Sequence, residues 1–233
     1  MSVARNKDEF VSRMRDALGE NIANPNDPSE EQVRRYFRTL NGRTQDAIDA
    51  YEGYASLFFI HLERSRNPDA TVVYPGGPGG RDVCDSFAEV RARRSENGRH
   101  IIDCRGFAVM GVELLSEAGF QFSSYMIAIP PTARTPGEWT GHVIAEMITP
   151  DGQRVYVGND RVHSFAANAI SNLAGWSPDD TINVRYAYGD TIQEAIDDAD
   201  EIVRRRSENP LSDSSVIGGL RSRRSIVPPL GRE

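Results

Sequence analysis

Cysteine is scarce in this sequence. Only Cys84 and Cys104 occur among 233 residues, and one potential bridge in a chain of this length is not a disulfide framework. The first twenty or so residues also lack the apolar core of a signal peptide, which predicts a reducing compartment. Each cysteine is then available for burial or for chemistry, and a Cys84–Cys104 disulfide is the alternative.

The chain has no basic surplus and no long apolar run. Its 27 Lys and Arg are outnumbered by 34 Asp and Glu, giving a formal net charge of −7. We therefore expect no binding of nucleic acid, which depends on positive charge that neutralises phosphates. The longest apolar candidate, Ala55–Leu62, is interrupted by His61 and is shorter than the roughly 20 residues of a membrane span. These absences predict a cytoplasmic protein, or one delivered into another cell by a non-classical route.

Composition and hydrophobic spacing divide the chain into three segments. Residues 1–28 are a polar N-terminal segment, in which a helix is expected over Asp8–Leu18. Residues 29–207 have the length of a single domain. Residues 208–233 are rich in Ser, Gly, Pro and Arg and show no periodicity, which predicts a flexible tail. The tail arginines either contact an acidic partner or are simply solvated.

Within residues 29–207 a helical pattern precedes a strand-like one. Ser29 and Gln32 predict a capping box, and the helical pattern that follows to about Arg66 is expected to break at Asn41-Gly42. Further elements are expected as a helix over 83–94, a helix that begins at Cys104, strands over 123–131, 142–148, 154–160 and 181–188, and a helix over 191–207. This order predicts an α+β fold with helical N-terminal elements, in which the cysteine-bearing helix packs on an antiparallel sheet.

Cys104 is the candidate nucleophile. Phe107, Met110 and Leu114 follow it at helical spacing, so Cys104 is expected in the first turn of the helix, on its buried stripe. The helix dipole and the unpaired N–H groups at such a position favour a thiolate. The same N–H groups can bind the oxyanion of a tetrahedral intermediate. The structural alternative is a small core residue.

His142 is the candidate base and Asp160 the candidate orienting residue. A hairpin is expected to turn at Pro150-Asp151-Gly152, and His142 and Asp160 stand at equal distances along the chain on either side of Asp151. The two ends of a simple hairpin therefore meet, which lets the carboxylate bind the far imidazole nitrogen. Asn159 is the substitute for Asp160, because a register shift of one residue exchanges their faces.

The remaining polar residues indicate no further site. His100 and Cys104 are spaced for one helical face, but a zinc site needs about four ligands and Cys84 has no companion ligand close by, so no metal and no cofactor is expected. His163 is expected at the surface. Arg105 is expected in a structural ion pair, with contact to an acidic substrate group as the alternative.

The order and setting of these residues resemble the transglutaminase-like superfamily, the papain-like enzymes with Cys, His and Asp in that order. The resemblance rests on the segments DCRGFAVMGVELLSEAGF, GHVIAEM and YVGND and covers about residues 98–162. It implies that Cys104 is the nucleophile, His142 the base and Asp160 the orienting residue. The sequence departs from the family where members often carry an aromatic residue soon after the histidine, since aliphatic residues follow His142 here.

The expected reaction is acyl transfer on a protein or peptide amide. Cys104 attacks the carbonyl, His142 protonates the leaving amine, and a thioester forms. Water then gives hydrolysis, as in a thiol protease or a glutamine deamidase, and we expect this outcome. A small acidic chain of this kind suits a bacterial effector that acts inside another cell. The alternatives are transglutaminase cross-linking and a non-catalytic protein-binding module on the same fold.

Overall fold

The structure, a computed structural model, describes residues 2–61, 86–92, 95–96, 98–137, 141–170 and 184–208. Its elements, in chain order, are α1 (Lys7–Leu18), α2 (Glu30–Thr39), α3 (Thr44–Phe58), β1 (Phe59–His61), α4 (Phe87–Arg91), β2 (Ser95–Glu96), β3 (Arg99–Ile102), α5 (Cys104–Glu117), β4 (Gln121–Ile129), β5 (His142–Ile148), β6 (Arg154–Gly158), β7 (Arg161–His163), α6 (Ala166–Ile170), β8 (Arg185–Gly189) and α8 (Ile192–Glu208). Over these residues the fold is α+β, with seven helices and a five-stranded antiparallel sheet.

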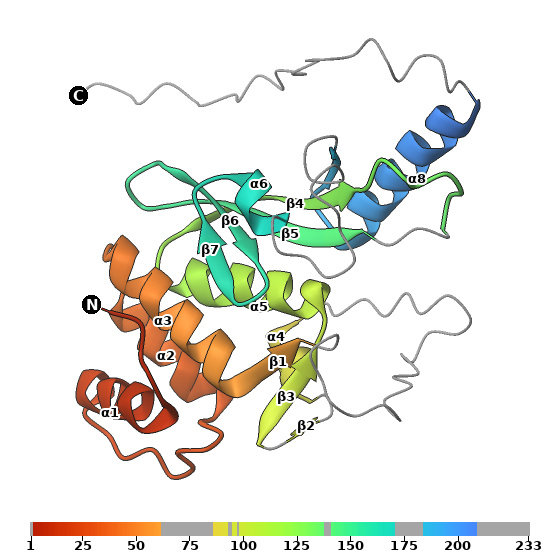
Figure 1. The fold of residues 1–233 in the computed structure, drawn as a ribbon. Coiled ribbons are helices and arrows are strands. Elements are labelled where there is room, and N and C mark those ends of the chain that lie inside the picture. Colours follow the sequence, from red (N-terminus) through yellow and green to blue (C-terminus); the bar gives the residue numbers. More distant parts are fainter. Residues whose placement is uncertain are drawn as a thin grey trace, which may run out of the picture.

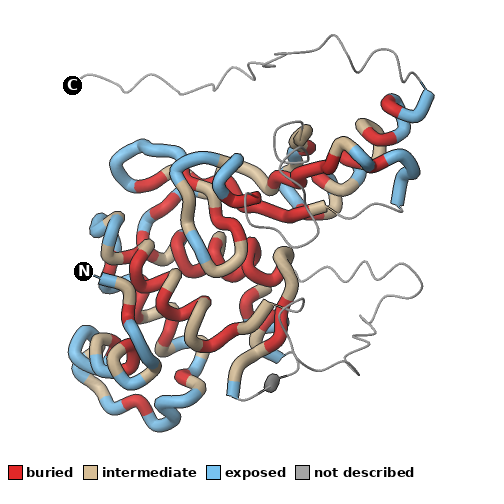
Figure 2. The backbone as a smooth tube through the Cα atoms, in the orientation of Figure 1, coloured by how far each residue is buried: buried red, intermediate tan, exposed pale blue. Residues whose placement is uncertain are grey.

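Helix α5 lies between two layers (Figure 1). Helices α1, α2 and α3 form the layer on one side, and the sheet, in the order β7-β6-β5-β4-β8, forms the other. Figure 2 shows that the backbone of α5 and of the strands above it is largely buried, whereas the outer side of α1 is exposed. The expected packing of the cysteine-bearing helix on an antiparallel sheet is confirmed.

The helical layer is built around aromatic side chains. The Tyr54 ring centroid lies 5.0 Å from that of Phe58 and 5.6 Å from that of Phe10. The capping box at Ser29 is present, and the break at Asn41-Gly42 is confirmed because α2 ends at Thr39 and α3 begins at Thr44.

The prediction that this helical pattern runs to about Arg66 was wrong. Helix α3 ends at Phe58, and Phe59–His61 forms strand β1, which pairs in parallel with β3. Three residues are too few to show a strand period in the sequence. His100 also lies in β3, so it shares no helix with Cys104.

Close contact between α5 and the sheet depends on Gly111. A Cβ at this position would lie 2.6 Å from Cγ1 of Val157 in β6. On the opposite face of the sheet, Ile144 of β5 packs against Ile170 of α6. The predicted turn at Pro150-Asp151-Gly152 is confirmed, since Thr149 and Gln153 close it by backbone hydrogen bonds.

The strand expected over 154–160 is shorter than predicted. Strand β6 ends at Gly158, and Asn159 has a left-handed φ of 54°. Asn159 and Asp160 form a two-residue turn, after which Arg161 pairs with Gly158 and β7 begins. Strand β7 and the short helix α6 were not predicted.

Helix α8 closes the described part of the chain and packs against β8 and β4. Its bounds confirm the helix expected over 191–207. Arg206, near its end, is 5% exposed and donates to the carbonyl of Pro130 at 2.9 Å. The tail after residue 208 and Cys84 lie outside the described residues. No helix among those that are described is long and apolar enough to cross a membrane.

Candidate active site around Cys104

Cys104 is the first residue of α5, as expected. Asp103 caps the helix, with its Oδ1 accepting the N–H of Gly106 at 3.0 Å. Arg105 donates to the other carboxylate oxygen at 2.9 Å, which confirms the structural ion pair. Cys104 is a thiol, partly exposed and packed against the main core. A partly exposed thiol at a helix N-terminus has the setting in which a thiolate is stabilised.

His142 is the first residue of β5 and is only 3% exposed. Burial, together with the charges of His61 and His163, lowers its pKa to about 3, and the charge of Asp103 acts in the opposite direction. Its Nε2 is buried and has no hydrogen-bond partner within the part of the chain that is described. At pH 7 the imidazole is therefore neutral, and burial disfavours its protonation.

Thiol and imidazole lie on different sides of the sheet plane. His142 stands directly opposite Ala128, and Ala128 shares with Ile144 the face that α6 covers. Cys104 packs against the core on the α5 side. Because side chains alternate between the two faces of a strand, the Cys104 thiol and the His142 imidazole can meet only past the end of the sheet.

The N-terminus of α5 lies at that end of the sheet. The Tyr51 hydroxyl is 3.0 Å from the carbonyl oxygen of Phe107 and 2.9 Å from that of Asn159. The part of α5 around Phe107 therefore lies beside the turn that ends β6. Cys104 lies about one helical turn before Phe107, toward the N-terminus of the helix. Asp103 lies within electrostatic range of His142, whose pKa its charge raises against the larger effect of burial.

Asp160 lies in the turn between β6 and β7, rather than in a strand opposite His142. The paired residues of β5 and β6 end at Ala145 and Val157. Burial is the main cause of the raised pKa of Tyr51 and of the lowered pKa of His163, and the negative charge of Asp160 acts on both groups in the upward direction. The structure thus brings Asp160 to His163, a residue expected at the surface that is half-buried in β7.

Asn159, the substitute orienting residue, has its carbonyl bound by Tyr51. Its side-chain Oδ1 is buried and has no hydrogen-bond partner among the residues that the structure describes. Neither Asn159 nor Asp160 forms a hydrogen bond with His142 in that part of the chain.

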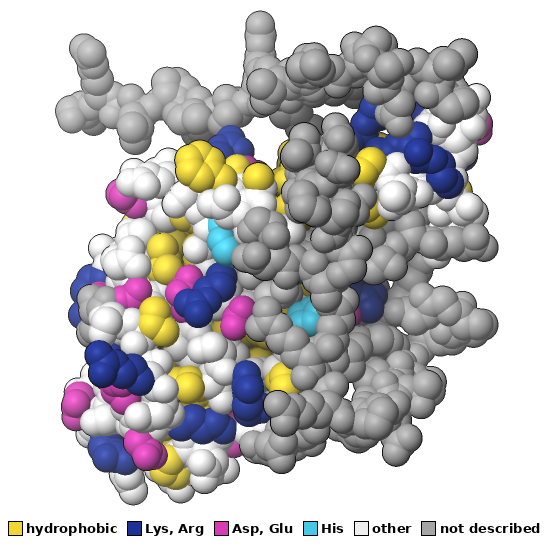
Figure 3. Space-filling view, viewed as in Figure 1, with side chains coloured by type: hydrophobic (Ala, Val, Ile, Leu, Met, Phe, Trp, Pro, Cys, Tyr) yellow, Lys and Arg dark blue, Asp and Glu magenta, His cyan; other side chains and the backbone are white. Residues whose placement is uncertain are grey.

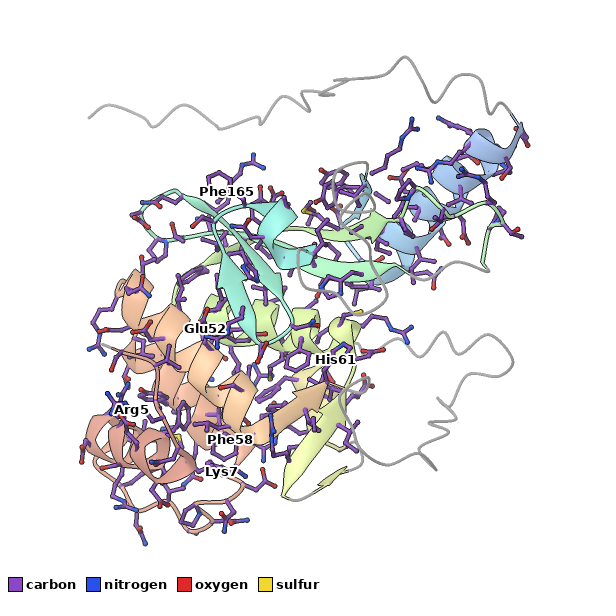
Figure 4. The ribbon with its side chains drawn as sticks, in the orientation of Figure 1. Arg5, Lys7, Glu52, Phe58, His61 and Phe165 are labelled. Carbon is purple, nitrogen blue, oxygen red and sulfur yellow. The ribbon has the colours of Figure 1, made fainter. Side chains whose placement is uncertain are left out.

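Sequence reasoning missed His61. It ends β1 beside Ile102, and its ring lies parallel to that of Phe107, at 6.1 Å between centroids. Figure 4 shows it on the side of the molecule where α5 begins, and Figure 3 shows histidine side chains at the surface between the helical layer and the sheet. The available signal was a histidine that ends an apolar run, which carries no chemistry by itself.

Among the described residues, no group of three or more His, Cys, Asp or Glu could hold a metal ion.

No protein-family model matches the chain, and neither a curated protein nor a solved structure matches it. The chemistry must therefore be argued from the thiol and the imidazoles at the start of α5.

Proposed function

We propose that this protein is a cysteine-dependent enzyme that transfers the acyl group of a protein or peptide amide through a thioester on Cys104. One observation carries the proposal. A partly exposed thiol begins α5, and its cap Asp103 lies within electrostatic reach of the buried, neutral imidazole of His142. Thiol acyl transfer needs a nucleophile at such a position and an imidazole that can reach it, and here the approach of His142 goes around the end of the sheet.

The proposed reaction has two steps. The thiol gives its proton to an imidazole, the sulfur attacks the carbonyl carbon, and backbone N–H groups of the first turn of α5 stabilise the oxyanion. The C–N bond breaks as the amine takes up a proton, which leaves the thioester. Water then attacks the thioester and releases the acid and the thiol. The enzyme is accordingly a hydrolase, a thiol protease or a glutamine deamidase.

A transglutaminase-like architecture is part of the proposal. Its support is the order of elements, in which a helix begun by Cys104 is followed by antiparallel strands, one of them begun by His142. For the role of His142 as base, the neutral imidazole is support, whereas the burial that lowers its pKa opposes protonation. The orienting role of Asp160 has weaker support, because its charge acts on His163 and Tyr51.

Three variants test the catalytic proposal. Cys104→Ala should abolish turnover and leave the melting temperature nearly unchanged, because Ala fits the first turn of a helix. His142→Ala should be almost as severe, and Asp160→Ala should retain more activity. Turnover is measured as cleavage of a fluorescent casein, ammonia release from a glutamine peptide and incorporation of a fluorescent amine. Full activity of a folded Cys104→Ala protein in any assay that the wild type passes would exclude the enzyme proposal.

A second test needs no substrate. Iodoacetamide alkylates thiolates, so a thiol of lowered pKa reacts faster than an ordinary one below pH 8. The chain contains its own reference thiol, and mass spectrometry of tryptic peptides separates Cys104 from Cys84. We expect Cys104 to react at least about tenfold faster than Cys84 at pH 6.5. Equal or slower alkylation of Cys104 would contradict its activation.

A further inference from the structure

Two imidazoles lie near the N-terminus of α5, and His61 is the one on the side of the thiol. Phe59 and His61 occupy alternate positions of β1 and so share a face. Both rings contact Phe107 of α5, that of Phe59 at 6.5 Å edge-on and that of His61 at 6.1 Å with only 10° between the planes. This face of the small sheet is therefore directed at the first turns of α5.

Strand pairing brings His61 close to Cys104. His61 pairs with Ile102 across the parallel strands β1 and β3, which in such sheets lie about 4.8 Å apart. Cys104 follows Ile102 after the single residue Asp103. Cys104 also lies one helical turn before Phe107, on which the His61 ring stacks. The Cys104 thiol and the His61 imidazole therefore have two neighbours in common, Ile102 in β3 and Phe107 in α5.

The two imidazoles differ in how far they are buried. His142 is 3% exposed, and burial is the largest cause of its lowered pKa. An imidazolium there would lose most of its hydration. His61 is only partly buried as a residue, although its Nε2 is buried, so an imidazolium at that position loses less of its hydration than one at His142. Its charge also contributes to the lowered pKa of His142, so a proton on His61 keeps His142 neutral.

We infer that His61 is a catalytic residue of the Cys104 site and holds the proton that leaves the thiol. This inference rests on the proposed function. The Cys104 S–H bond breaks, its proton binds a ring nitrogen of His61, and the sulfur keeps the electron pair. After attack on the carbonyl, the His61 imidazolium returns that proton to the nitrogen of the leaving amine. His61 is then neutral again and takes a proton from the attacking water, and that proton returns to the sulfur as the C–S bond of the thioester breaks, while His142 stays neutral.

Other charged groups around His61 set the conditions for this transfer. His142 approaches from β5, and Asp103, paired with Arg105, lies at the start of α5. On β3, His100 lies 3.3 Å from Asp27. Arg99, also on β3, donates to the carbonyl oxygens of Ser56 and Phe59. Among these groups Asp103 is the anion at the helix start, and it favours a cation there.

The pH profile of Cys104 alkylation tests the inference. The rate is measured by mass spectrometry from pH 5 to 9 in the full-length wild type and in His61→Gln and His61→Phe. His61→Phe keeps an aromatic ring against Phe107 while removing both nitrogens. His100→Gln is the control, because it removes another imidazole of the same small sheet, one that packs against Phe59 and lies 3.3 Å from Asp27. Melting temperatures establish that each variant is folded.

We expect both His61 variants to move the midpoint of the profile up by at least one pH unit, which lowers the rate at pH 6.5 about tenfold. His100→Gln should keep the wild-type profile. If Cys104 is fast in the wild type and either folded His61 variant retains its profile, the inference is overturned while the proposed function stands. If Cys104 is no faster than Cys84 in the wild type, the proposed function itself fails.

Discussion

At the scale of single residues, Tyr51 connects the candidate site to the helical layer. It comes from the middle of α3, is fully buried, and its hydroxyl lies within hydrogen-bond distance of carbonyls in α5 and in the β6–β7 turn. Burial is the main cause of its strongly raised pKa, so the group remains a phenol that can donate. One hydroxyl thereby fixes the start of α5 relative to the end of the sheet.

Replacing Tyr51 by Phe should lower the free energy of unfolding by about 1–3 kcal/mol, because two buried carbonyl groups lose a shared donor. Turnover and the alkylation rate of Cys104 should fall as well, since the start of α5 loses its connection to the sheet. Urea unfolding and the alkylation assay measure the two effects. Tyr36→Phe is the control, as Tyr36 is 2% exposed but lies in α2, away from the site. Equal effects of both variants on alkylation would refute the connecting role.

The buried imidazole of His142 should make stability depend on pH. Its pKa falls from 6.5 to about 3 on folding, so between these values the unfolded chain binds a proton that the folded protein does not. The free energy of unfolding contributed by this group therefore rises with pH in that window, by up to about 1.4 kcal/mol per pH unit. The stability that the neutral imidazole of His142 contributes is lost progressively as the pH falls below 6.5.

Urea unfolding at pH 5 and pH 7 checks this dependence. His142→Leu should show a smaller gain in stability between these pH values than the wild type. His163→Leu is the comparison, because the pKa of His163 is also lowered by burial but the residue is only half-buried. Identical pH dependence in the wild type and His142→Leu would show that the imidazole is not buried in the neutral form.

Which site residues the sequence could identify depends on how local their signals are. The position of Cys104 followed from the helical spacing of the apolar residues that come directly after it. The position of Asp160 depended on a hairpin register, and the left-handed Asn159 ended the strand early. His61 is brought to the site by a parallel pairing with β3, across a long separation in sequence. No pattern local to His61 encodes that pairing.

At the scale of elements, the same distinction holds between local sequence signals and pairings with distant parts of the chain. Helices α1, α2, α5 and α8 and the strands of the central hairpins were predicted because each shows its own period over several turns or alternations. Strands β1 and β7 and helix α6 contain at most five residues each, and their formation depends on partners elsewhere in the chain. The short elements are the ones that bring His61 and His163 toward the site.

Packing of α5 on the sheet should be sensitive to one added methyl group. Gly111→Ala places a Cβ 2.6 Å from Val157 and should lower the free energy of unfolding by about 1–3 kcal/mol, even though Ala favours a helix. The substitution Gly53→Ala in α3 is the matched control. Its nearest neighbours would lie at 3.5 Å, so it should stabilise the protein by up to about 1 kcal/mol.

Thermal and urea unfolding of both glycine variants show whether the steric clash with Val157 or the higher helix propensity of Ala determines the change in stability. Adding Val157→Ala to Gly111→Ala should recover part of the loss, because it removes the methyl groups that the new Cβ meets. A stabilised Gly111→Ala protein would show that α5 lies further from β6 than described.

At the scale of the whole molecule, the two sides of the sheet are covered differently. The main core joins the helical layer, α5, one sheet face and α8, whereas a smaller cluster lies under α6 on the other face. Residues of α8 such as Ala199 and Val203 belong to the main core and are fully buried. The last helix is therefore part of the main core, and we expect shortening of the chain into α8 to lower its stability.

Two truncations test where the folded domain ends. The composition of residues 209–233 predicts a tail that contributes little to stability, so a chain that ends at Glu208 should melt within about 2 °C of the full-length protein and keep the same alkylation rate at Cys104. A chain that ends at Asp200 loses the buried Val203 and the bond from Arg206 to Pro130. Removing these contacts should cost about 3 kcal/mol or more, which corresponds to a fall of roughly 6–12 °C in melting temperature. A large fall already in the chain that ends at Glu208 would mean that the tail packs on the domain.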